Sequence, residues 1–259
     1  MRWLTGERFP RIPGYDLAGT LLTAAGDLPA GTPVFGMVDS HQGRACAQEV
    51  VIPVAQIAAA PEGLTPIDAA SVPLAALTAL QALRDHLRVS KGDRVLINGA
   101  SGGVGTLAVQ LAAILGAHVT GVCSGRNTDR VTALGADAVI DYTQTDVTTL
   151  TGFDAVFDVF GSLPWPSASA LLTRRGRYCT TIVRPAFLAR GALARIGLHR
   201  AHFVHVRSRR ADLDSIRELI ERGHLHPVVD RVWPLSEARA AHAYLETKRA
   251  RGKVVLSLP

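Results

Sequence analysis

The chain has 259 residues, of which 47% are hydrophobic and 19% charged, and this balance is typical of a globular protein with one large domain or two smaller ones. Its formal net charge is +6, but only 5% of its residues are aromatic, so side chains that stack on bases are scarce and nucleic-acid binding is not expected. No apolar run reaches the roughly 20 residues of a membrane helix, and the start MRWLTGERFP lacks the apolar core of a secretory signal. We therefore predict a cytoplasmic protein without membrane contact. Three cysteines without a CxxC pair predict free thiols.

The first part of the chain has the composition of short strands joined by turns. From residue 12 to about residue 56, glycine and proline separate short apolar runs (TLLTAA, PVFGMV, CAQEVVI). From about Pro66 the texture changes, because DAASVPLAALTALQALRDHL places alanine and leucine at helical spacing. We expect a mainly β part followed by helix.

Strands and helices then alternate, and this order predicts a parallel sheet with crossover helices. Six strands are expected, which match a doubly wound α/β sheet of the Rossmann type. The tail is expected to add a helix over 236–247 and a strand over 253–258. The six predicted strands span residues 94–97, 118–123, 138–140, 155–160, 177–183 and 203–206.

A glycine-rich turn, GASGGVG, connects the first of these strands to a helix predicted over 104–115. Such a turn lets backbone N–H groups at a helix start face a pyrophosphate, with Gly102 allowing close approach and Gly105 allowing close helix packing. Ala100 stands where the usual GxGxxG motif has its first glycine, so the motif alone is weak evidence, and a turn that serves packing is the alternative. The complete strand, turn and helix around it favours a dinucleotide site.

The end of the second strand indicates which dinucleotide is bound. An NAD-preferring site usually has an acidic residue there for the ribose hydroxyls, whereas this chain has Cys123, Ser124 and Arg126. A hydroxyl and a guanidinium suit a 2′-phosphate, so NADPH is the expected cofactor. A solvated arginine at a helix start is the alternative for Arg126.

Several stretches of the chain resemble a known family. The stretches PRIPGYDLAG, PEGLTPIDAASVPLAALTALQAL, VLINGASGGVGTLAVQLA, LGADAVIDY, FDAVFDVFG and GKVVL are similar to the zinc-independent quinone-oxidoreductase branch of the medium-chain dehydrogenase/reductase superfamily. The resemblance implies NADPH-dependent reduction of a quinone or an α,β-unsaturated carbonyl. An enoyl-thioester reductase and an NADPH-binding module with little turnover are the alternatives.

The resemblance also implies a layout in which a Rossmann domain is inserted in a β-rich GroES-like substrate domain. We expect the substrate domain over residues 1–86, the NADPH-binding domain over 87–223 and a return to the substrate domain over 224–259. Family members have more residues ahead of the PGYD stretch, so the substrate domain is expected to be truncated at its N-terminal side. Strand edges left unpaired by a truncation invite pairing with another chain or aggregation, and a homodimer is the expected form of such pairing.

Several cofactor-binding residues are implied by matching the family's motifs. Thr78 matches a threonine beside the nicotinamide, with a bond to its own helix backbone as the alternative. Tyr142 matches a tyrosine beside the 2′-phosphate, with packing as the alternative. Residues 160–162 and 182–184 end the fourth and fifth strands, where open α/β sheets bind ligands. The full predicted set is Thr78, Ala100, Ser101, Gly102, Gly103, Val104, Gly105, Ser124, Arg126, Tyr142, Phe160 and Ile182.

No metal site is expected, although many relatives of this family are zinc alcohol dehydrogenases. Tyr15 and Leu74 stand where those enzymes have metal ligands, and the cysteine-rich structural zinc lobe has no counterpart. The run His199, His202 and His205 crosses a predicted loop-to-strand transition, so its members are not expected to share a face. Without a metal, catalysis rests on holding the nicotinamide near an electron-poor carbon, with hydrogen-bond donors for the developing oxyanion. No catalytic side chain is identified.

Overall fold

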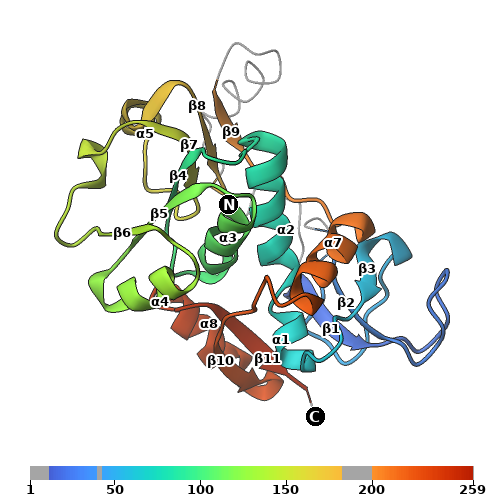
Figure 1. The fold of residues 1–259 in the computed structure, drawn as a ribbon. Coiled ribbons are helices and arrows are strands. Elements are labelled where there is room, and N and C mark those ends of the chain that lie inside the picture. Colours follow the sequence, from blue (N-terminus) through green and yellow to red (C-terminus); the bar gives the residue numbers. More distant parts are fainter. Residues whose placement is uncertain (1–11, 40–42, 183–199, 259) are drawn as a thin grey trace, which may run out of the picture.

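The computed structural model describes residues 12–39, 43–182 and 200–258. Its centre is a six-stranded parallel sheet with the strand order β6-β5-β4-β7-β8-β9 (Figure 1). The first strand of the unit lies in the middle and the chain turns to the other side after β6, which confirms the predicted doubly wound Rossmann sheet. The strands are β4 (Arg94–Asn98), β5 (His118–Cys123), β6 (Ala138–Asp141), β7 (Phe153–Asp158), β8 (Leu172–Thr180) and β9 (Ala201–Phe203).

Both faces of this sheet are buried, because successive side chains of its apolar strands point to opposite sides. Val95 and Ile97 of β4 and Phe157 of β7 lie in the larger hydrophobic core, whereas Leu96 and Val156 lie in a second core on the other face. Helices cover both faces: α2, α3, α4 and α7 contribute to the larger core and α5 to the second (Figure 1). These helices are α2 (Pro73–Gln81), extended by a wider helical turn at Ala82–His86, α3 (Gly103–Ile114), α4 (Thr128–Ala133), α5 (Trp165–Leu171) and α7 (Arg210–Glu221).

The N-terminal part forms a three-stranded antiparallel sheet in the order β1-β2-β3, so the predicted short strands are present. Leu28, Val34 and Ile57 form a small core of their own beneath it. A short helix follows, and its cap residue Thr65 accepts a hydrogen bond from the N–H of Asp68 at 3.1 Å. The elements are β1 (Asp16–Thr20), β2 (Pro33–Met37), β3 (Ile57–Ala59) and α1 (Pro66–Ala70).

The tail forms the predicted helix, α8 (Ala238–Glu246), and the predicted strand, β11 (Lys253–Ser257). β11 pairs in parallel with β10 (Val229–Pro234), a strand that was not predicted from the sequence. The Nζ of Lys253 lies 2.6 Å from Oδ2 of Asp16, so the tail contacts β1 as a shared substrate domain requires. The domain boundaries at residues 86 and 223 stay a prediction.

Several strands begin or end at other residues than predicted, where polar or charged residues interrupt the apolar pattern. β8 begins at Leu172 rather than at Arg177, because the polar stretch LTRRG precedes its apolar part. β7 ends at Asp158, so Phe160 lies in the loop beyond it, and β9 begins two residues earlier than predicted and ends at Phe203. Val183 and Arg184 lie outside the described residues.

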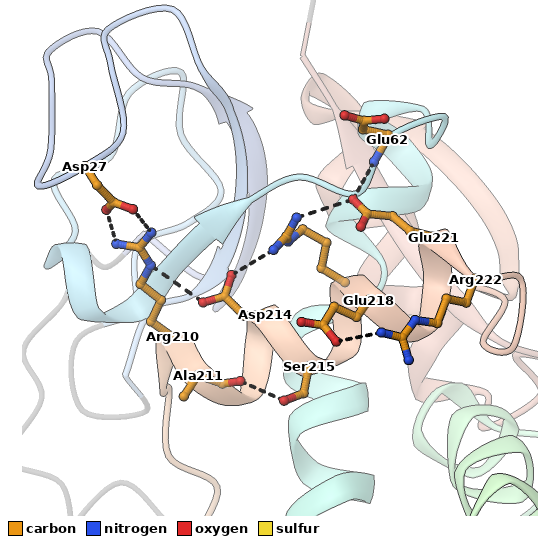
Figure 2. A network of polar contacts seen from close by, with 10 residues as sticks. Asp27, Glu62, Arg210, Ala211, Asp214, Ser215, Glu218, Glu221 and Arg222 are labelled. Atoms are coloured by element: carbon orange, nitrogen blue, oxygen red, sulfur yellow. Dashed lines mark hydrogen bonds and ion pairs between the residues drawn. The ribbon is translucent and has the colours of Figure 1, made fainter.

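An ionic network fastens α7 to the N-terminal part (Figure 2). Arg210 binds Asp27 with both terminal nitrogens and also faces Asp214 at 3.8 Å. On the next turns Arg217 bridges Asp214 and Glu221, each at 3.6 Å. The Glu221 carboxylate in turn accepts the backbone N–H of Glu62 at 3.2 Å, so the network contacts the N-terminal part at two places.

Candidate functional site

The turn between β4 and α3 has the geometry of a phosphate-binding turn. Gly99 adopts a positive φ of 87°, which favours glycine, and the N–H groups of Gly99 and Ala100 donate to the carbonyl of Val122 on β5. α3 then begins at Gly103, and its cap residue Gly102 contributes no side-chain hydrogen bond. The first N–H groups of a helix lack partners within the helix, so this start can offer them to an anion.

Two glycines of the turn serve different purposes. A Cβ atom on Gly105 would collide with the carbonyl oxygen of Gly99, so α3 and the end of β4 lie too close for any side chain there. A Cβ atom on Gly102 would have no atom nearer than the same oxygen at 3.5 Å. Gly102 therefore leaves an empty cradle in front of the helix start, while Gly105 permits close packing.

A cleft of about 1040 Å³ opens at the carboxyl ends of the central strands. Parallel α/β sheets bind ligands at this edge, where the strand order reverses. Six of the predicted residues line the cleft together: Ser101, Gly102, Ser124, Arg126, Tyr142 and Phe160. The structure thus brings the phosphate turn and the ends of β5, β6 and β7 around one space of a size that holds a dinucleotide.

Six predicted residues do not line this cleft. Thr78 is buried and its hydroxyl donates to the carbonyl of Leu74 at 2.6 Å, which is the alternative considered for it. Ala100 is fully buried, and Ile182 lies against Gly161, where a Cβ atom would collide with its side chain. The remaining three, Gly103, Val104 and Gly105, form the first turn of α3 behind the cleft wall.

Asn127 joins the phosphate turn to the end of β5, a role that sequence reasoning missed. Its Nδ2 donates to the hydroxyl oxygens of both Ser101 and Ser124 at 3.1 Å. The Asn127 Oδ1 is buried in the cleft wall and has no hydrogen-bond partner among the described residues. A buried acceptor without a partner is costly, and a ligand hydroxyl would satisfy it. This orphaned atom and the Gly102 cradle both fit a nucleotide.

A carboxylate lies at the β5 end of the cleft, on the neighbouring strand β6. Asp141 ends β6 beside Cys123 and lines the cleft. The backbone N–H and hydroxyl of Thr143 hold the pKa of Asp141 below its usual range, helped by the N–H of Gly125, so it stays ionised at neutral pH. The absence of an acidic residue at the end of β5 therefore does not extend to the whole cleft.

A buried carboxylate shapes the loop that follows β7. Asp158 is fully buried and accepts the N–H groups of Gly161 and Leu163 at 2.8 and 2.9 Å and an amide hydrogen of Asn98 at 2.7 Å. The Tyr178 hydroxyl also donates to it at 3.0 Å. Burial, with the charge of Asp158 second, raises the pKa of Tyr178, so this hydroxyl stays protonated. The loop carrying Phe160 is thereby held at the cleft.

The C-terminal segment supplies one wall of the cleft through residues 247–250. Lys248 has a positive φ of 58°, and its Nζ lies 5.7 Å from the centre of the Phe160 ring. Sequence reasoning missed this wall, although the basic run KRAR just before GKVVL was a signal for an anion-binding segment.

No group of three histidine, cysteine, aspartate or glutamate side chains that could hold a metal occurs within the described ranges. Leu74 uses its N–H to donate to Asp16, and His199 lies outside those ranges. No helix in the described part of the chain is long and apolar enough to cross a membrane.

Comparison with known proteins gives consistent matches. A family model described as zinc-binding dehydrogenase matches residues 134–256. A trans-enoyl reductase of Aspergillus terreus is 34% identical over 99% of this chain and 79% of its own length. A mitochondrial NAD(P)H oxidoreductase of Mus musculus is 35% identical over 98% of this chain and 72% of its own length.

Among solved structures, the quinone oxidoreductase from Coxiella burnetii superposes with a TM-score of 0.88 at 32% identity. The superposition covers 97% of this chain and 81% of that one. The mouse relative is named as mitochondrial, so a cytoplasmic location for this chain stays a prediction.

Proposed function

We propose that this chain, which belongs to the quinone-oxidoreductase-like branch of the medium-chain dehydrogenase/reductase superfamily, is an NAD(P)H-dependent reductase of a quinone or an α,β-unsaturated carbonyl. One observation carries the proposal: the Gly102 cradle at the start of α3 opens into a cleft large enough for a dinucleotide. The N–H groups at this helix start would hold the pyrophosphate. Bound there, the cofactor supplies a hydride.

NADPH rather than NADH is the proposed cofactor. Arg126 and Ser124 follow the end of β5, and Tyr142 follows β6, where its N–H donates to the carbonyl of Cys123 at 3.1 Å. Asp141 is the competing feature, because a carboxylate accepts ribose hydroxyls and repels a phosphate. Its Oδ1 already accepts the backbone N–H and the hydroxyl of Thr143, which lessens its need for ribose hydroxyls. The guanidinium of Arg126 is paired with no carboxylate among the described residues.

The ratio of the dissociation constants for NADPH and NADH tests this choice. Replacing Arg126 by alanine removes a charge-assisted contact that is exposed to solvent, so we expect NADPH to bind about tenfold more weakly and NADH to be nearly unchanged. Adding Cys123→Asp to Arg126→Ala should move the preference further toward NADH. Titrations at one fixed ionic strength measure the ratio, with Arg239→Ala on α8 as a control outside the cleft. A wild-type ratio that already favours NADH would refute the NADPH assignment.

Reduction is proposed to need no metal, since Tyr15 and Leu74 occupy the positions of metal ligands in zinc-dependent relatives and neither offers a preferred zinc donor. The protein would orient the substrate and donate hydrogen bonds to its developing oxyanion, and water would supply the proton. We expect a chelator to leave the rate of NADPH oxidation unchanged. Elemental analysis that finds one tightly held zinc per chain, together with loss of activity on its removal, would contradict this.

An enoyl-thioester substrate is the second candidate, because the Aspergillus terreus relative is named a trans-enoyl reductase. A panel of quinones, enones and enoyl thioesters, each tested for NADPH consumption by the purified chain, separates the two. Cofactor binding without turnover on any member would favour the third reading, a binding module. A homodimer is proposed as the assembly, and its mass in solution tests it.

A further inference from the structure

Asn127 is a buried residue whose side chain does not cap the helix that follows it. It stands at the N-cap position of α4, where an asparagine oxygen usually accepts a hydrogen bond from the first N–H groups of the helix, yet its side chain makes no such bond. Only 6% of its surface is exposed. The amide lies instead between the phosphate turn and the end of β5, where its Nδ2 contacts the hydroxyls of Ser101 and Ser124. The side chain therefore belongs to the cleft wall and not to the cap of α4.

The direction of these two hydrogen bonds decides what the serines can offer to a ligand. Nδ2 carries two hydrogens and accepts none, so both serine oxygens act as acceptors and each hydroxyl keeps its own hydrogen. Neither hydroxyl donates to an acceptor within the ranges that the structure describes, and both serines line the cleft. Ser101 and Ser124 thus each have one hydrogen available for an acceptor in the cleft.

The other end of the Asn127 amide makes this arrangement costly without a ligand. Its Oδ1 is buried and finds no hydrogen-bond partner in the described part of the chain. With the amide turned over, Oδ1 would accept both serine hydroxyls, and the serines would have no hydrogen left for the cleft. The observed orientation thus leaves an acceptor unpaired and keeps two donors free. A ligand in the cleft that accepts both serine hydrogens would offset this cost.

We propose that Asn127 is a positioning residue that turns the hydroxyl hydrogens of Ser101 and Ser124 into the cleft, so that the site presents donors before the cofactor binds. This rests on the proposed function, since it takes a nicotinamide dinucleotide to lie in the cleft. Pyrophosphate oxygens only accept hydrogen bonds, and donors fixed in advance bind them without the cost of reorientation. Both cofactors have these oxygens, so Asn127 strengthens NADH and NADPH alike, whereas Arg126 is proposed to favour NADPH.

Asn127→Asp tests the proposal, because it keeps the shape of the side chain and reverses its hydrogen bonds. A carboxylate only accepts, so both serine hydroxyls would donate to it and none would be left for the ligand. Asn127→Leu has a similar size and neither donates nor accepts, so the serines stay free to turn toward the ligand. Thr132→Asp adds the same charge at an exposed position of α4 outside the cleft lining and is the matched control.

The probe is NAD⁺, titrated calorimetrically, because its pyrophosphate stays ionised in weak acid and the molecule is stable there. Thermal melts of each variant check folding. At neutral pH we expect Asn127→Asp to bind NAD⁺ at least about tenfold more weakly than the wild type, Asn127→Leu to lose less than about fivefold and Thr132→Asp to stay within about twofold. NADP⁺ should lose the same factor as NAD⁺ in each variant.

Two further measurements separate positioning from a structural role. The loss in Asn127→Asp should shrink as the pH falls through the pKa of the introduced carboxyl, because the protonated acid has a hydrogen to donate to one serine. The combined variant Ser101→Ala, Ser124→Ala separates this effect from the plain loss of charge, since in that background Asn127→Asp has no hydroxyls to turn. There we expect Asn127→Asp to cost less, and Asn127→Leu to cost nothing further.

A loss in Asn127→Asp that does not change with pH, or that is as large without the two serines, would overturn the proposal. An equal loss in Asn127→Leu and Asn127→Asp would also overturn it, because the shape of the wall would then explain both. Where Asn127→Asp does not fold, the loss in Asn127→Leu decides, since it must vanish in the background without the serines. Failure of the wild type to bind NAD⁺ or NADP⁺ would instead refute the proposed function itself.

Discussion

At the scale of single residues, two glycines of the phosphate turn are needed for different reasons, close backbone packing and space for a ligand. Gly105 is needed because the backbone of Gly99 occupies the place of its side chain. Gly102 has ordinary dihedral angles, with φ at −84° and ψ at 174°, and free space beside it, so its own conformation does not require glycine. Its small size matters only if a ligand occupies the cradle.

Alanine at these two positions should therefore have opposite consequences. Gly105→Ala forces backbone apart in a packed turn, so we expect it to lower the free energy of unfolding by about 2 kcal/mol. Gly102→Ala should leave the free energy of unfolding nearly unchanged but weaken NADPH, and Gly102→Val should abolish NADPH binding. Urea unfolding and calorimetric titration measure the two effects. A folded Gly102→Val protein with wild-type affinity would sink the pyrophosphate assignment.

At the scale of the elements, the loop after β7 depends on one buried carboxylate. Asp158 accepts two backbone N–H groups of this loop, whereas Asn98 and Tyr178 have second partners in Ser162 and the carbonyl of Leu163. Without Asp158 these two N–H groups would have no acceptor, and a buried donor without a partner costs about 1 to 3 kcal/mol.

Asp158→Ala is expected to lower the free energy of unfolding by about 2 to 5 kcal/mol, since both of these N–H groups lose their acceptor. Tyr178→Phe removes only one donor to a carboxylate that keeps others, so we expect a loss of about 1 kcal/mol. Asp154→Ala, on the same strand but half-buried, is the control and should cost less than Asp158→Ala. Urea unfolding measures all three variants, and similar losses for Asp154→Ala and Asp158→Ala would contradict the role assigned to the buried carboxylate.

The burial and composition of the individual elements explain how much of the fold and of the site could be predicted from the sequence. β4 and β5 were predicted nearly to the residue because most of their residues are buried. β10 was missed because DRVWP mixes charges and a proline in a two-stranded sheet, where pairing with β11 decides its conformation. In the site, Arg126 follows directly from a strand end. The KRAR run marks Arg249 as basic but does not show that it lies at the cleft, and Asn127 is placed by its bonds to Ser101 and Ser124.

At the scale of the whole molecule, α7 joins the larger core to the N-terminal part by two kinds of contact. Leu213 and Ile216 of its inner face are fully buried, while its outer face carries the ionic network of Figure 2. The hydrogen bond from Arg210 holds the pKa of Asp27 below its usual range. Asp27 is exposed, so its attraction to Arg210 is open to screening by salt.

Arg210→Gln is expected to lower the melting temperature slightly at low salt, and the difference from the wild type should narrow in high salt. A carboxyl whose pKa is lower in the folded state stabilises the fold above its unfolded pKa of about 3.9, and this contribution is lost as the pH falls through the folded value. The difference in melting temperature between the wild type and Arg210→Gln should therefore disappear at acidic pH. Arg222→Gln, whose partner Glu218 lies on the same helix, is the control. A deficit in Arg210→Gln that persists unchanged at pH values below the folded pKa of Asp27 would show that lost packing, not charge, causes it.

In the ion pair between Asp16 and Lys253, it matters which of the two positions carries the negative charge. Asp16 also accepts the N–H of Leu74 at the start of α2, where a negative charge is favoured by the helix dipole. The side chain of Lys253 packs against Gly103 at the start of α3, beside the turn that would receive the phosphates. Exchanging the two residues would preserve their mutual attraction, yet it would place an ammonium at one helix start and a carboxylate at the other. The start of α2 favours the carboxylate of Asp16, and phosphates held at the turn before α3 would favour the ammonium of Lys253 over a carboxylate. The exchanged pair is therefore not equivalent to the observed one.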